Sequence, residues 1–346
     1  MTTLRLATYN VEWFNTLFDD AGAMLMDDGP SARYHITRAQ QLTALGAVFA
    51  ALDVDGVMII EGPDNSGTRS TVKALEGFAQ HFRLRTRRAV VGYTSDTEQE
   101  IAFLYDPDVL TARHDPMGDP APARGAPGAP RFDSQLRLDV DGDGADDLIR
   151  FSKPPLELDV TLSGGQSLRL IGVHAKSKAA HSRNPGTDLK ALGIGNRRKQ
   201  LAECLWLRAR VERLLPAGTP LIVLGDFNDG PGLDEYEQLF GKSSVEVVMA
   251  PDARPDLRLF DPHADLAIKM PDGPTPTTAR FWIDPTKSYF EALIDFIMVS
   301  PDLAAGNPDW RIWHPLTDPA IIANTGLQAA LLSASDHYPV TIDLVM

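Results

Sequence analysis

The chain has 346 residues, of which 43% are hydrophobic and 23% are charged, and its formal net charge is −14. This composition is that of a globular protein with a substantial core, and the longest apolar runs are too short to span a membrane. An acidic surface repels polyanions at long range, which argues against a protein that grips duplex DNA through many phosphates but leaves room for a nuclease with a local cationic site. The single cysteine, Cys204, excludes an intrachain disulfide and fits a reducing compartment.

Strand and helix patterns alternate from the N-terminus onward. Because MTTLRLATYN enters a strand pattern almost at once, it leaves no room for an apolar signal sequence, and we expect a cytoplasmic protein. In the first third of the chain, the spacing of apolar residues predicts strands at residues 4–10, 56–60 and 101–106 and helices at 36–52 and 69–80.

One dense run of basic residues follows the second predicted helix. Arg83, Arg85 and Arg87 alternate with other residues, which predicts a strand that carries all three on one face, and Arg88 follows directly. We interpret this run as a solvated edge strand that its charge protects from aggregation, with a nucleic-acid contact as the alternative.

The remainder of the sequence combines strands with Pro-rich and Gly-rich segments. Residues 107 to about 135 predict a long loop, and we place a Pro/Gly-rich loop insertion at about 107–150. Ser163-Gly164-Gly165 lies between two strand patterns and indicates a hairpin. The other predicted elements are strands at 156–162, 166–174, 221–225, 293–300 and 338–345, a helix at 196–214, a short helix after residue 230 and a loop region at 251–287. Since no segment has the composition of a linker, we expect one mixed α/β domain over residues 1–346.

Polar residues stand at, or just inside, the ends of several predicted strands. They are Asn10, Glu61, His174, Asp226 with Asn228, Asp295, and Asp336 with His337. Burying such groups is costly unless they are paired or used. Because the ends of adjacent strands share one rim of a sheet, we expect these side chains to converge there.

The residue types in this set favour one kind of chemistry. Carboxylate and amide oxygens are hard ligands that suit Mg²⁺ or Mn²⁺. Phosphoryl transfer requires a metal to neutralise the phosphate oxygens, a group that orients or deprotonates water, and a cationic donor. The sequence contains no Cys/His cluster with zinc spacing, no GxxxxGK[ST] loop and no GxSxG motif, so it gives no support to those alternatives.

Six short motifs occur in the order ATYNVEWF, IIEGPDN, GVHAKSK, VLGDFND, LIDFIMVS and SDHYPV. Together they resemble the motifs of the endonuclease/exonuclease/phosphatase superfamily, and the resemblance runs from residue 4 to residue 345. It implies a four-layered α/β sandwich with two central mixed β-sheets, helices on the outer faces and an active site at one rim.

The resemblance also implies roles for the residues that bind the metal and the water. Glu61 resembles the family's principal metal ligand, with Asn10 beside it, and Asp336 adds a metal or water contact. Asp226 and Asn228 resemble the pair that orients the attacking water and the scissile phosphate.

Further roles concern the groups around the phosphate. His337 resembles the histidine that donates to the phosphate, and Asp295 resembles the carboxylate that fixes its orientation. His174 matches a second histidine that the nuclease, phosphatase and sphingomyelinase branches share and the apurinic endonucleases lack. Lys153 occupies the position of a phosphate-facing arginine, which makes it the expected substrate-binding residue. Glu100 is a candidate partner for His174, and a solvated strand end is the alternative.

An acidic segment, DVDGDGADD, resembles the beginning of a calcium-binding loop. Asp139, Asp141 and Asp143 occupy positions 1, 3 and 5, but position 12 is Arg150, where an EF-hand needs Glu. We therefore reject an EF-hand and keep a structural Ca²⁺ site at the three aspartates as an alternative to a plain acidic turn.

The sequence thus predicts a Mg²⁺-dependent or Mn²⁺-dependent hydrolase of phosphoester bonds that acts by in-line attack of an activated water. An endonuclease or exonuclease acting on DNA or RNA is the alternative. A catalytically silent binding module of the same fold is a weaker alternative, because every expected position is filled. We expect a small-molecule or nucleic-acid substrate, no membrane association and no obligate protein partner.

Overall fold

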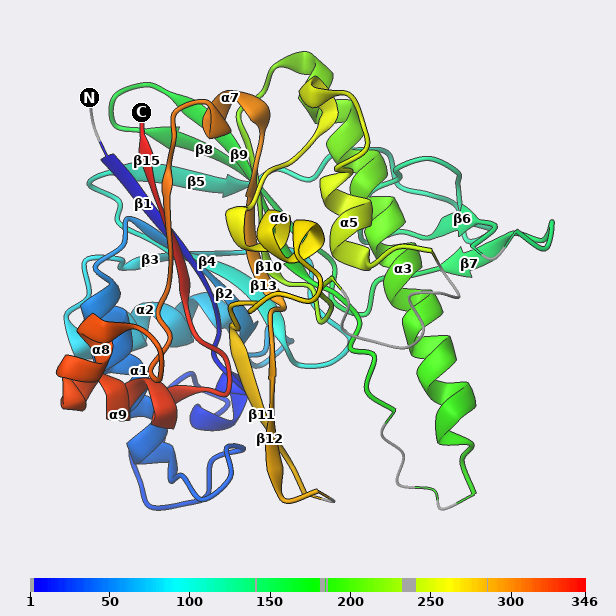
Figure 1. Cartoon of the computed structure of the whole chain (residues 1–346). Helices are drawn as coiled ribbons and strands as arrows, with labels where there is room; N and C mark the ends of the chain where they lie inside the picture. Colours follow the sequence, from blue (N-terminus) through cyan, green and yellow to red (C-terminus); the bar gives the residue numbers. More distant parts are fainter. Residues whose placement is uncertain (1–2, 141, 181–183, 185, 232–240, 285) are drawn as a thin grey trace.

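The computed structural model describes residues 3–140, 142–180, 184, 186–231, 241–284 and 286–346. In this part of the chain, two large mixed sheets lie face to face and helices cover their outer sides (Figure 1), which confirms the predicted four-layered α/β sandwich. The first sheet has the strand order β14 (Asp309–Ile312), β15 (Val340–Val345), β1 (Thr3–Asn10), β2 (Gly56–Gly62), β4 (Glu100–Tyr105) and β3 (Arg88–Val91).

The second sheet and two separate hairpins complete the β-structure of the described residues. The second sheet has the order β13 (Asp295–Val299), β10 (Leu221–Asp226), β9 (Ser167–His174), β8 (Leu156–Leu162) and β5 (Leu110–His114). The hairpins are β6 (Leu136–Leu138) with β7 (Asp147–Ile149), and β11 (Ala279–Ile283) with β12 (Ser288–Ala292). Each large sheet contains one parallel pair, β1 with β2 and β9 with β10, among antiparallel neighbours.

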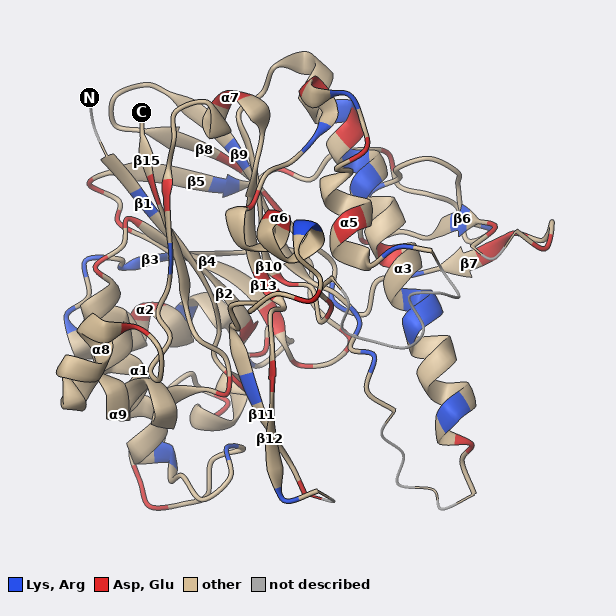
Figure 2. Cartoon of the chain, viewed as in Figure 1, with Lys and Arg blue, Asp and Glu red and all other residues tan. Residues whose placement is uncertain are grey.

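Helices cover both outer faces, and acidic and basic residues are distributed over many of the helices, strands and loops (Figure 2). The first sheet is covered by α1 (Arg38–Leu52), α2 (Thr71–Phe82), α8 (Pro319–Ala323) and α9 (Thr325–Ala334), and the second by α3 (Leu189–Leu214), α5 (Ser244–Met249) and α6 (Pro262–Lys269). The short elements are α7 (Pro301–Ala304) and the 3₁₀ turns η1 (Phe14–Leu17), η2 (Leu215–Ala217) and η3 (Pro255–Leu257). Among the described residues, no helix combines the length and the hydropathy that crossing a bilayer requires.

The central strands are apolar throughout because both of their faces are buried. In β2, Met58 and Ile60 point into the inner core between the sheets, whereas Val57 and Ile59 pack against the helices of the first layer. The inner core also takes side chains from the second sheet, such as Leu170. Because the two sheets share this core, we continue to infer a single domain.

The basic run does not form the predicted strand. Arg83 ends α2 in a left-handed conformation with a φ of 54°, and β3 begins only at Arg88. Arg85 forms ion pairs with aspartates, including Asp55 at 2.6 Å, and Arg87 pairs with Asp108 at 2.7 Å. The arginines of this run therefore pair with acidic residues and do not share one face of a strand. The prediction of a strand that carries Arg83, Arg85 and Arg87 was wrong.

Three further boundaries differ from the sequence prediction. The expected loop at 107–135 contains β5, an edge strand that pairs with β8. The expected loop region at 251–287 contains α6 and β11, and α3 begins at Leu189 rather than at residue 196. β5, α6 and β11 are short, and the first turns of α3 are largely exposed, so the apolar pattern of these segments is weak. Neighbouring Pro and Gly residues also mask it. The hairpin at Ser163-Gly164-Gly165 is confirmed by the pairing of β8 with β9.

Candidate active site

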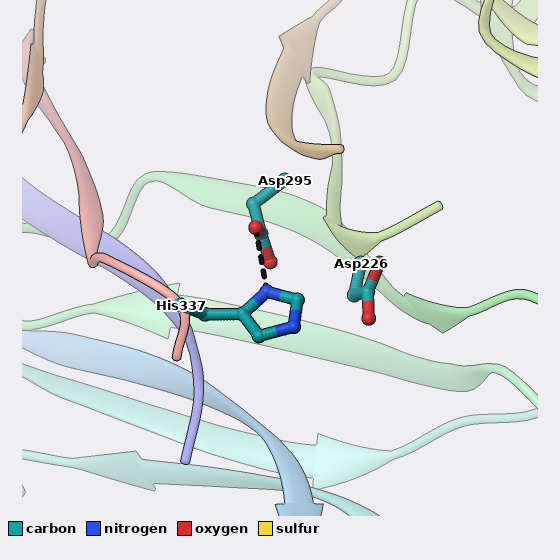
Figure 3. A group of neighbouring side chains, drawn as sticks. All are labelled: Asp226, Asp295 and His337. Carbon is teal, nitrogen blue, oxygen red and sulfur yellow. Dashed lines mark hydrogen bonds and ion pairs between the residues drawn. The ribbon is translucent and has the colours of Figure 1, made fainter. Parts of the chain in front are cut away.

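Three of the predicted site residues stand side by side at the end of the second sheet. In the strand register, Asp226 of β10 lies beside His174 of β9 on one side and beside Asp295 of β13 on the other. Residues paired across neighbouring strands project from the same face of the sheet. Figure 3 shows Asp226 and Asp295 on either side of His337, which comes from the loop before β15.

The first sheet contributes Asn10 and Glu61 from the ends of adjacent strands. Asn10 ends β1 and is paired with Ile60 of β2, directly before Glu61. The pairing of β2 with β4 shifts register between Ile59 and Gly62, and Glu61 has a φ of 62°. A bulge of this kind re-aims a side chain at a functional edge. The Glu61 carboxylate accepts a hydrogen bond from the Trp13 backbone N–H at 2.8 Å.

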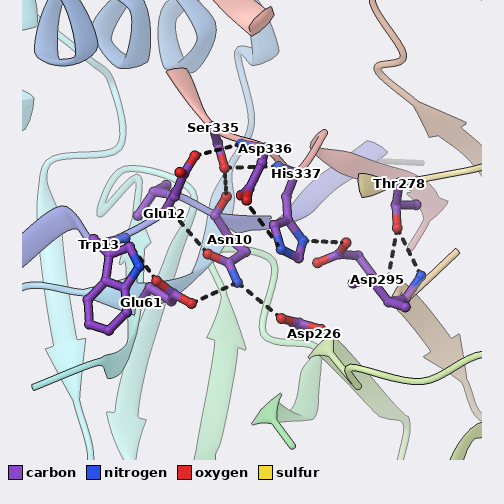
Figure 4. Close-up of polar contacts among 12 residues, drawn as sticks. Asn10, Glu12, Trp13, Glu61, Asp226, Thr278, Asp295, Ser335, Asp336 and His337 are labelled. Atoms are coloured by element: carbon purple, nitrogen blue, oxygen red, sulfur yellow. Dashed lines mark hydrogen bonds and ion pairs between the residues drawn. The ribbon is translucent and has the colours of Figure 1, made fainter. Parts of the chain in front are cut away.

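Asn10 joins the two halves of the site (Figure 4). Its amide nitrogen donates to the Asp226 carboxylate at 3.0 Å and to the Glu61 carboxylate at 3.4 Å. The Nε2 atom of His174 lies 3.7 Å from Asp226 and 3.9 Å from Glu61. Polar residues from both sheets therefore converge on one point, as the strand-end pattern predicted.

The segment GDFND is a turn built to hold Asp226. Gly225 has a φ of 146°, and a Cβ atom at this position would lie 1.9 Å from the Val173 carbonyl oxygen, so only glycine fits. Asn228, in a left-handed conformation with a φ of 50°, donates to the Asp226 carboxylate from its backbone N–H at 2.7 Å and from its amide at 3.1 Å. The turn thus fixes both carboxylate oxygens.

His337 is oriented by a carboxylate. Its Nδ1 atom lies 2.8 Å from Asp295, and its backbone N–H donates to the Ser335 hydroxyl, which in turn donates to the Asn10 carbonyl. Thr278 accepts the backbone N–H of Asp295 at 3.0 Å. Burial lowers the pKa of His337, but the carboxylates of Asp295 and its neighbours outweigh burial and raise that pKa well above its usual value. The ring is therefore held as a cation.

Two acidic groups of the site have raised pKa values because burial outweighs the positive charges near them. Burial raises the pKa of Asp226 to about 7 and that of Asp336 to about 8. The backbone N–H of Asp336 donates to Glu12, which also pairs with Arg33. Ionised carboxylates in such surroundings are stabilised by a bound cation.

The donor set fits a hard divalent cation. Glu61, Asp226 and Asp336 present carboxylate oxygens, the type of ligand that Mg²⁺ and Mn²⁺ prefer, whereas Asn10 turns its amide nitrogen toward Glu61 and Asp226 and its Oδ1 accepts the Glu12 backbone N–H. Among the described residues, Asp226, Asp295 and His337 also place ligand atoms within 4.8 Å of one another. In that group the Nδ1 atom of His337 is already engaged by Asp295, so the oxygen donors around Glu61 suit a cation better.

Two basic or imidazole groups are buried next to these carboxylates. Burial lowers the pKa of Lys153, although the nearby carboxylates of Glu203, Glu61 and Asp226 oppose the shift. Burial, together with the charge of Lys153, lowers the pKa of His174 well below its usual value, so this ring is neutral. The structure thus brings both predicted residues to the site.

Glu100 does not pair with His174. Its carboxylate instead accepts backbone N–H groups of Ser95 and Asn65, and no described residue forms a hydrogen bond with the buried Nδ1 of His174. The proposed pair was therefore wrong: a carboxylate at this strand end is satisfied by the adjacent loop.

Several supporting residues were missed by the sequence reasoning. Glu203 of α3 accepts the backbone N–H of Lys176 at 2.8 Å. Glu12 and Ser335 fix the loop that carries His337. Glu12 and Ser335 lie inside or next to the recognised motifs, which is the one signal in the sequence that marks them, whereas Glu203 lies in the middle of a helix and has no such signal.

The predicted calcium site receives no further support. Both oxygens of Asp139 accept backbone N–H groups of the loop, from Gly142 at 2.8 Å and from Gly144 at 2.9 Å. The Asp143 carboxylate accepts a hydrogen bond from the Ala145 backbone N–H, and Asp141 lies outside the described residues. A Ca²⁺ ion at this loop stays a prediction.

The chain matches a known protein family in sequence and several solved structures in fold. The profile of the endonuclease/exonuclease/phosphatase family matches residues 7–337. An endonuclease/exonuclease/phosphatase from Bacteroides vulgatus is similar in structure, with 13% identity, full coverage of both chains and a TM-score of 0.52. An AP endonuclease from Archaeoglobus fulgidus has 12% identity and a TM-score of 0.49, with 99% of this chain and 100% of that one covered. A mannosyl-6-phosphatase from Bacteroides thetaiotaomicron has 13% identity and a TM-score of 0.47, with the same coverage. No curated relative matches the chain in sequence.

Proposed function

The chain belongs to the endonuclease/exonuclease/phosphatase family, and from that premise we propose that it is a divalent-metal-dependent hydrolase of phosphoester bonds. The observation that carries this proposal is the junction at Asn10, whose amide touches the carboxylates of both Glu61 and Asp226. This contact brings the acidic ends of two sheets to one point, where His337 is held as a cation. Oxygen ligands beside a cationic donor are what phosphoryl transfer to water requires.

The metal is assigned to the carboxylates of Glu61 and Asp336 and to the Oδ1 atom of Asn10, which also accepts the Glu12 backbone N–H. Held there, Mg²⁺ or Mn²⁺ would supply positive charge that neutralises phosphate oxygens and makes a nearby water more acidic. Glu61 is suited to this role because its backbone is fixed by the bulge and one carboxylate oxygen accepts the Trp13 N–H, which leaves the other directed toward Asn10.

The attacking water is assigned to Asp226 and Asn228. Asp226 is rigid because both of its oxygens accept hydrogen bonds from Asn228, and its raised pKa makes it a competent acceptor of a proton near neutral pH. In-line attack needs such a fixed acceptor on the side of the phosphate opposite the leaving group.

The phosphate is assigned to His337, Lys153 and His174. His337, kept protonated by Asp295, donates from Nε2 to a phosphate oxygen, and Lys153, whose charge acts on the neighbouring His174, adds positive charge to the site. His174 is neutral, so its Nε2–H donates a hydrogen bond without adding charge. These donors stabilise the negative charge that develops on the oxygens in the transition state.

A nuclease is the second candidate, on one specific observation. Burial and the charge of Lys199 lower the pKa of Lys176 while Glu203 opposes that shift, and the charge of Lys176 in turn acts on His174, so two lysines lie near the rim beside His174. Such a pair of lysines suits the phosphates that flank a scissile bond. A silent binding module is disfavoured, since each position that the family motifs specify is filled and brought together.

A panel of phosphoesters tests the proposal. Bis-p-nitrophenyl phosphate, p-nitrophenyl phosphate, single-stranded DNA and RNA are incubated with Mg²⁺, Mn²⁺ or EDTA. We expect hydrolysis of at least one ester that depends on the metal and stops in EDTA. Absence of turnover on every ester with either metal would rule out the proposed activity and favour the binding module.

A further inference from the structure

A two-stranded arm, β11 with β12, extends beyond the ends of β10 and β13 (Figure 1). Backbone hydrogen bonds tie its base to the loop that carries His337. The Arg280 N–H donates to the Asp336 carbonyl at 2.7 Å, and the Tyr338 N–H donates to the Thr278 carbonyl at 2.6 Å. The arm is therefore fixed in place relative to the site.

The register of the arm gives it two distinct faces. Phe281 pairs with Phe290, and the next pair outward is Trp282 with Tyr289. Successive strand residues point to opposite faces, so the first pair lies on one face and the second pair on the other. Ile283 shares the face of Phe281 and Phe290.

The face with Phe281 continues the surface of the candidate site. The Phe281 ring lies edge-on to the His337 ring, with centroids 5.5 Å apart. Farther out, Phe290 is 46% exposed and Ile283 is 36% exposed. An apolar surface thus begins at His337 and runs outward along this face, because Arg280 and Glu291 belong to the opposite face and the other charged pair, Asp284 with Lys287, lies at the tip of the arm (Figure 2).

On the opposite face of the arm, an arginine side chain already covers an aromatic ring. The Arg280 guanidinium lies 3.7 Å from the centre of the Tyr289 ring, and its Nε atom lies 3.2 Å from the Glu291 carboxylate. Trp282 packs against Tyr289 with centroids 5.0 Å apart. This face provides an internal reference, with aromatic residues of similar exposure that do not adjoin His337.

We propose that the face formed by Phe281, Ile283 and Phe290 binds an aromatic ring that the substrate carries beside its scissile phosphate, as a nucleotide does. The inference rests on the proposed function and specifies its substrate class. A ring needs only one flat contact to stack, whereas an alkyl chain needs a groove that encloses it, and the arm offers an open face. Stacking also supplies affinity that does not depend on cations, which suits a chain with a net charge of −14.

One pair of ligands and one pair of variants isolate the contribution of the ligand's aromatic ring to binding. Thymidine 5′-monophosphate and 2-deoxyribose 5-phosphate share the sugar and the phosphate and differ in the base. Their dissociation constants are measured by calorimetry with Mg²⁺ for the wild type, for Phe290→Ala and for the matched control Tyr289→Ala. Hexyl phosphate serves as the alkyl probe.

We expect the wild type to bind thymidine 5′-monophosphate about tenfold more tightly than 2-deoxyribose 5-phosphate, which is the range of one stacked base. Phe290→Ala should lose most of this preference, and Tyr289→Ala should keep it. Hexyl phosphate should bind no more tightly than the sugar phosphate. Calorimetry needs no turnover, so the hydrolysis of bis-p-nitrophenyl phosphate by the same preparations reports on the proposed function separately.

Three results would overturn the inference. The wild type could bind thymidine 5′-monophosphate and 2-deoxyribose 5-phosphate with equal affinity, or the preference for the nucleotide could survive in Phe290→Ala. The third is that Tyr289→Ala loses this preference as fully as Phe290→Ala does. Binding of hexyl phosphate as tight as that of the nucleotide would instead identify the face as a site for an apolar chain.

Discussion

Single residues of the site hold one another in position. Asn10 links the two sheets, Asp295 orients His337, and Asn228 fixes Asp226. The sequence alone predicted this convergence because each residue stands at or near one end of an apolar strand, where a polar group without a partner is costly. It did not predict Glu203, because an acidic residue in the middle of a helix is normally solvated and nothing local shows that it lies under a loop.

The first prediction concerns the pair formed by His337 and Asp295. His337→Ala should lower kcat about 10²-fold with a smaller effect on KM, because its donor acts on charge that develops in the transition state. Asp295→Asn should show a weaker defect of the same kind, since the ring loses the carboxylate that keeps it charged. Steady-state kinetics on the best ester of the panel measures both. A severe His337→Ala with a harmless Asp295→Asn would show that the pairing has no role in catalysis.

The second prediction uses Glu100. Burial raises the pKa of this carboxyl from 4.5 to about 7, so the folded state binds its proton more tightly than the unfolded state. The wild type therefore loses stability as the pH rises from 4.5 to 7, by up to about 3 kcal/mol at pH 8. Gln in this position keeps the acceptor for the Ser95 N–H and has no proton to lose. Urea denaturation should show Glu100→Gln close to the wild type at pH 5 and more stable at pH 8.

An equal stability difference at pH 5 and pH 8 would show that the Glu100 carboxyl titrates normally.

Whole strands and turns determine where the site residues stand. The apolar runs predicted the central strands, because both faces of strands such as β2 and β10 are buried. The edge elements β5 and β11 were missed, since half-exposed strands carry a mixed pattern that resembles a loop. These strands form because they pair with other strands, and the local sequence pattern carries no information about that pairing.

The third prediction concerns the turn at the end of β10. Gly225→Ala should lower the free energy of unfolding by about 2 kcal/mol or more, because Cβ meets the Val173 carbonyl and the φ of 146° is strained for alanine. The displaced Asp226 should also reduce activity. Gly77→Ala in α2 is the matched control: its Cβ meets no atom within 4 Å, and helix propensity should stabilise it by up to about 1 kcal/mol.

Urea denaturation measures both glycine variants. A Gly225→Ala protein as stable and as active as the wild type would show that the turn tolerates a side chain.

The charge of the whole molecule limits how it meets its substrate. The net charge is −14, and the densest basic run is neutralised by aspartates through Arg85 and Arg87. Positive charge that faces the candidate site comes from Lys153 and His337. We therefore expect the molecule to bind a few phosphates at one place rather than a long polyanion.

The fourth prediction follows from this charge distribution. Binding of a labelled DNA duplex, measured by fluorescence anisotropy across a salt series, should show a slope that corresponds to about one to three phosphate contacts at ~0.9 log units each. A steep slope that disappears in the variant Arg83→Ala/Arg85→Ala/Arg87→Ala would identify the basic run as a nucleic-acid contact.

The central claim is that the acidic junction of the two sheets binds a divalent cation that supports phosphoester hydrolysis. Glu61→Gln tests it most directly, because the substitution removes the charge of the proposed ligand while an amide oxygen still accepts the Trp13 N–H. The measurement is kcat/KM for the best ester at saturating Mn²⁺, with the melting temperature as a control for folding. We predict a loss of about 10²-fold or more at an unchanged melting temperature. Turnover within a few-fold of the wild type would contradict the account.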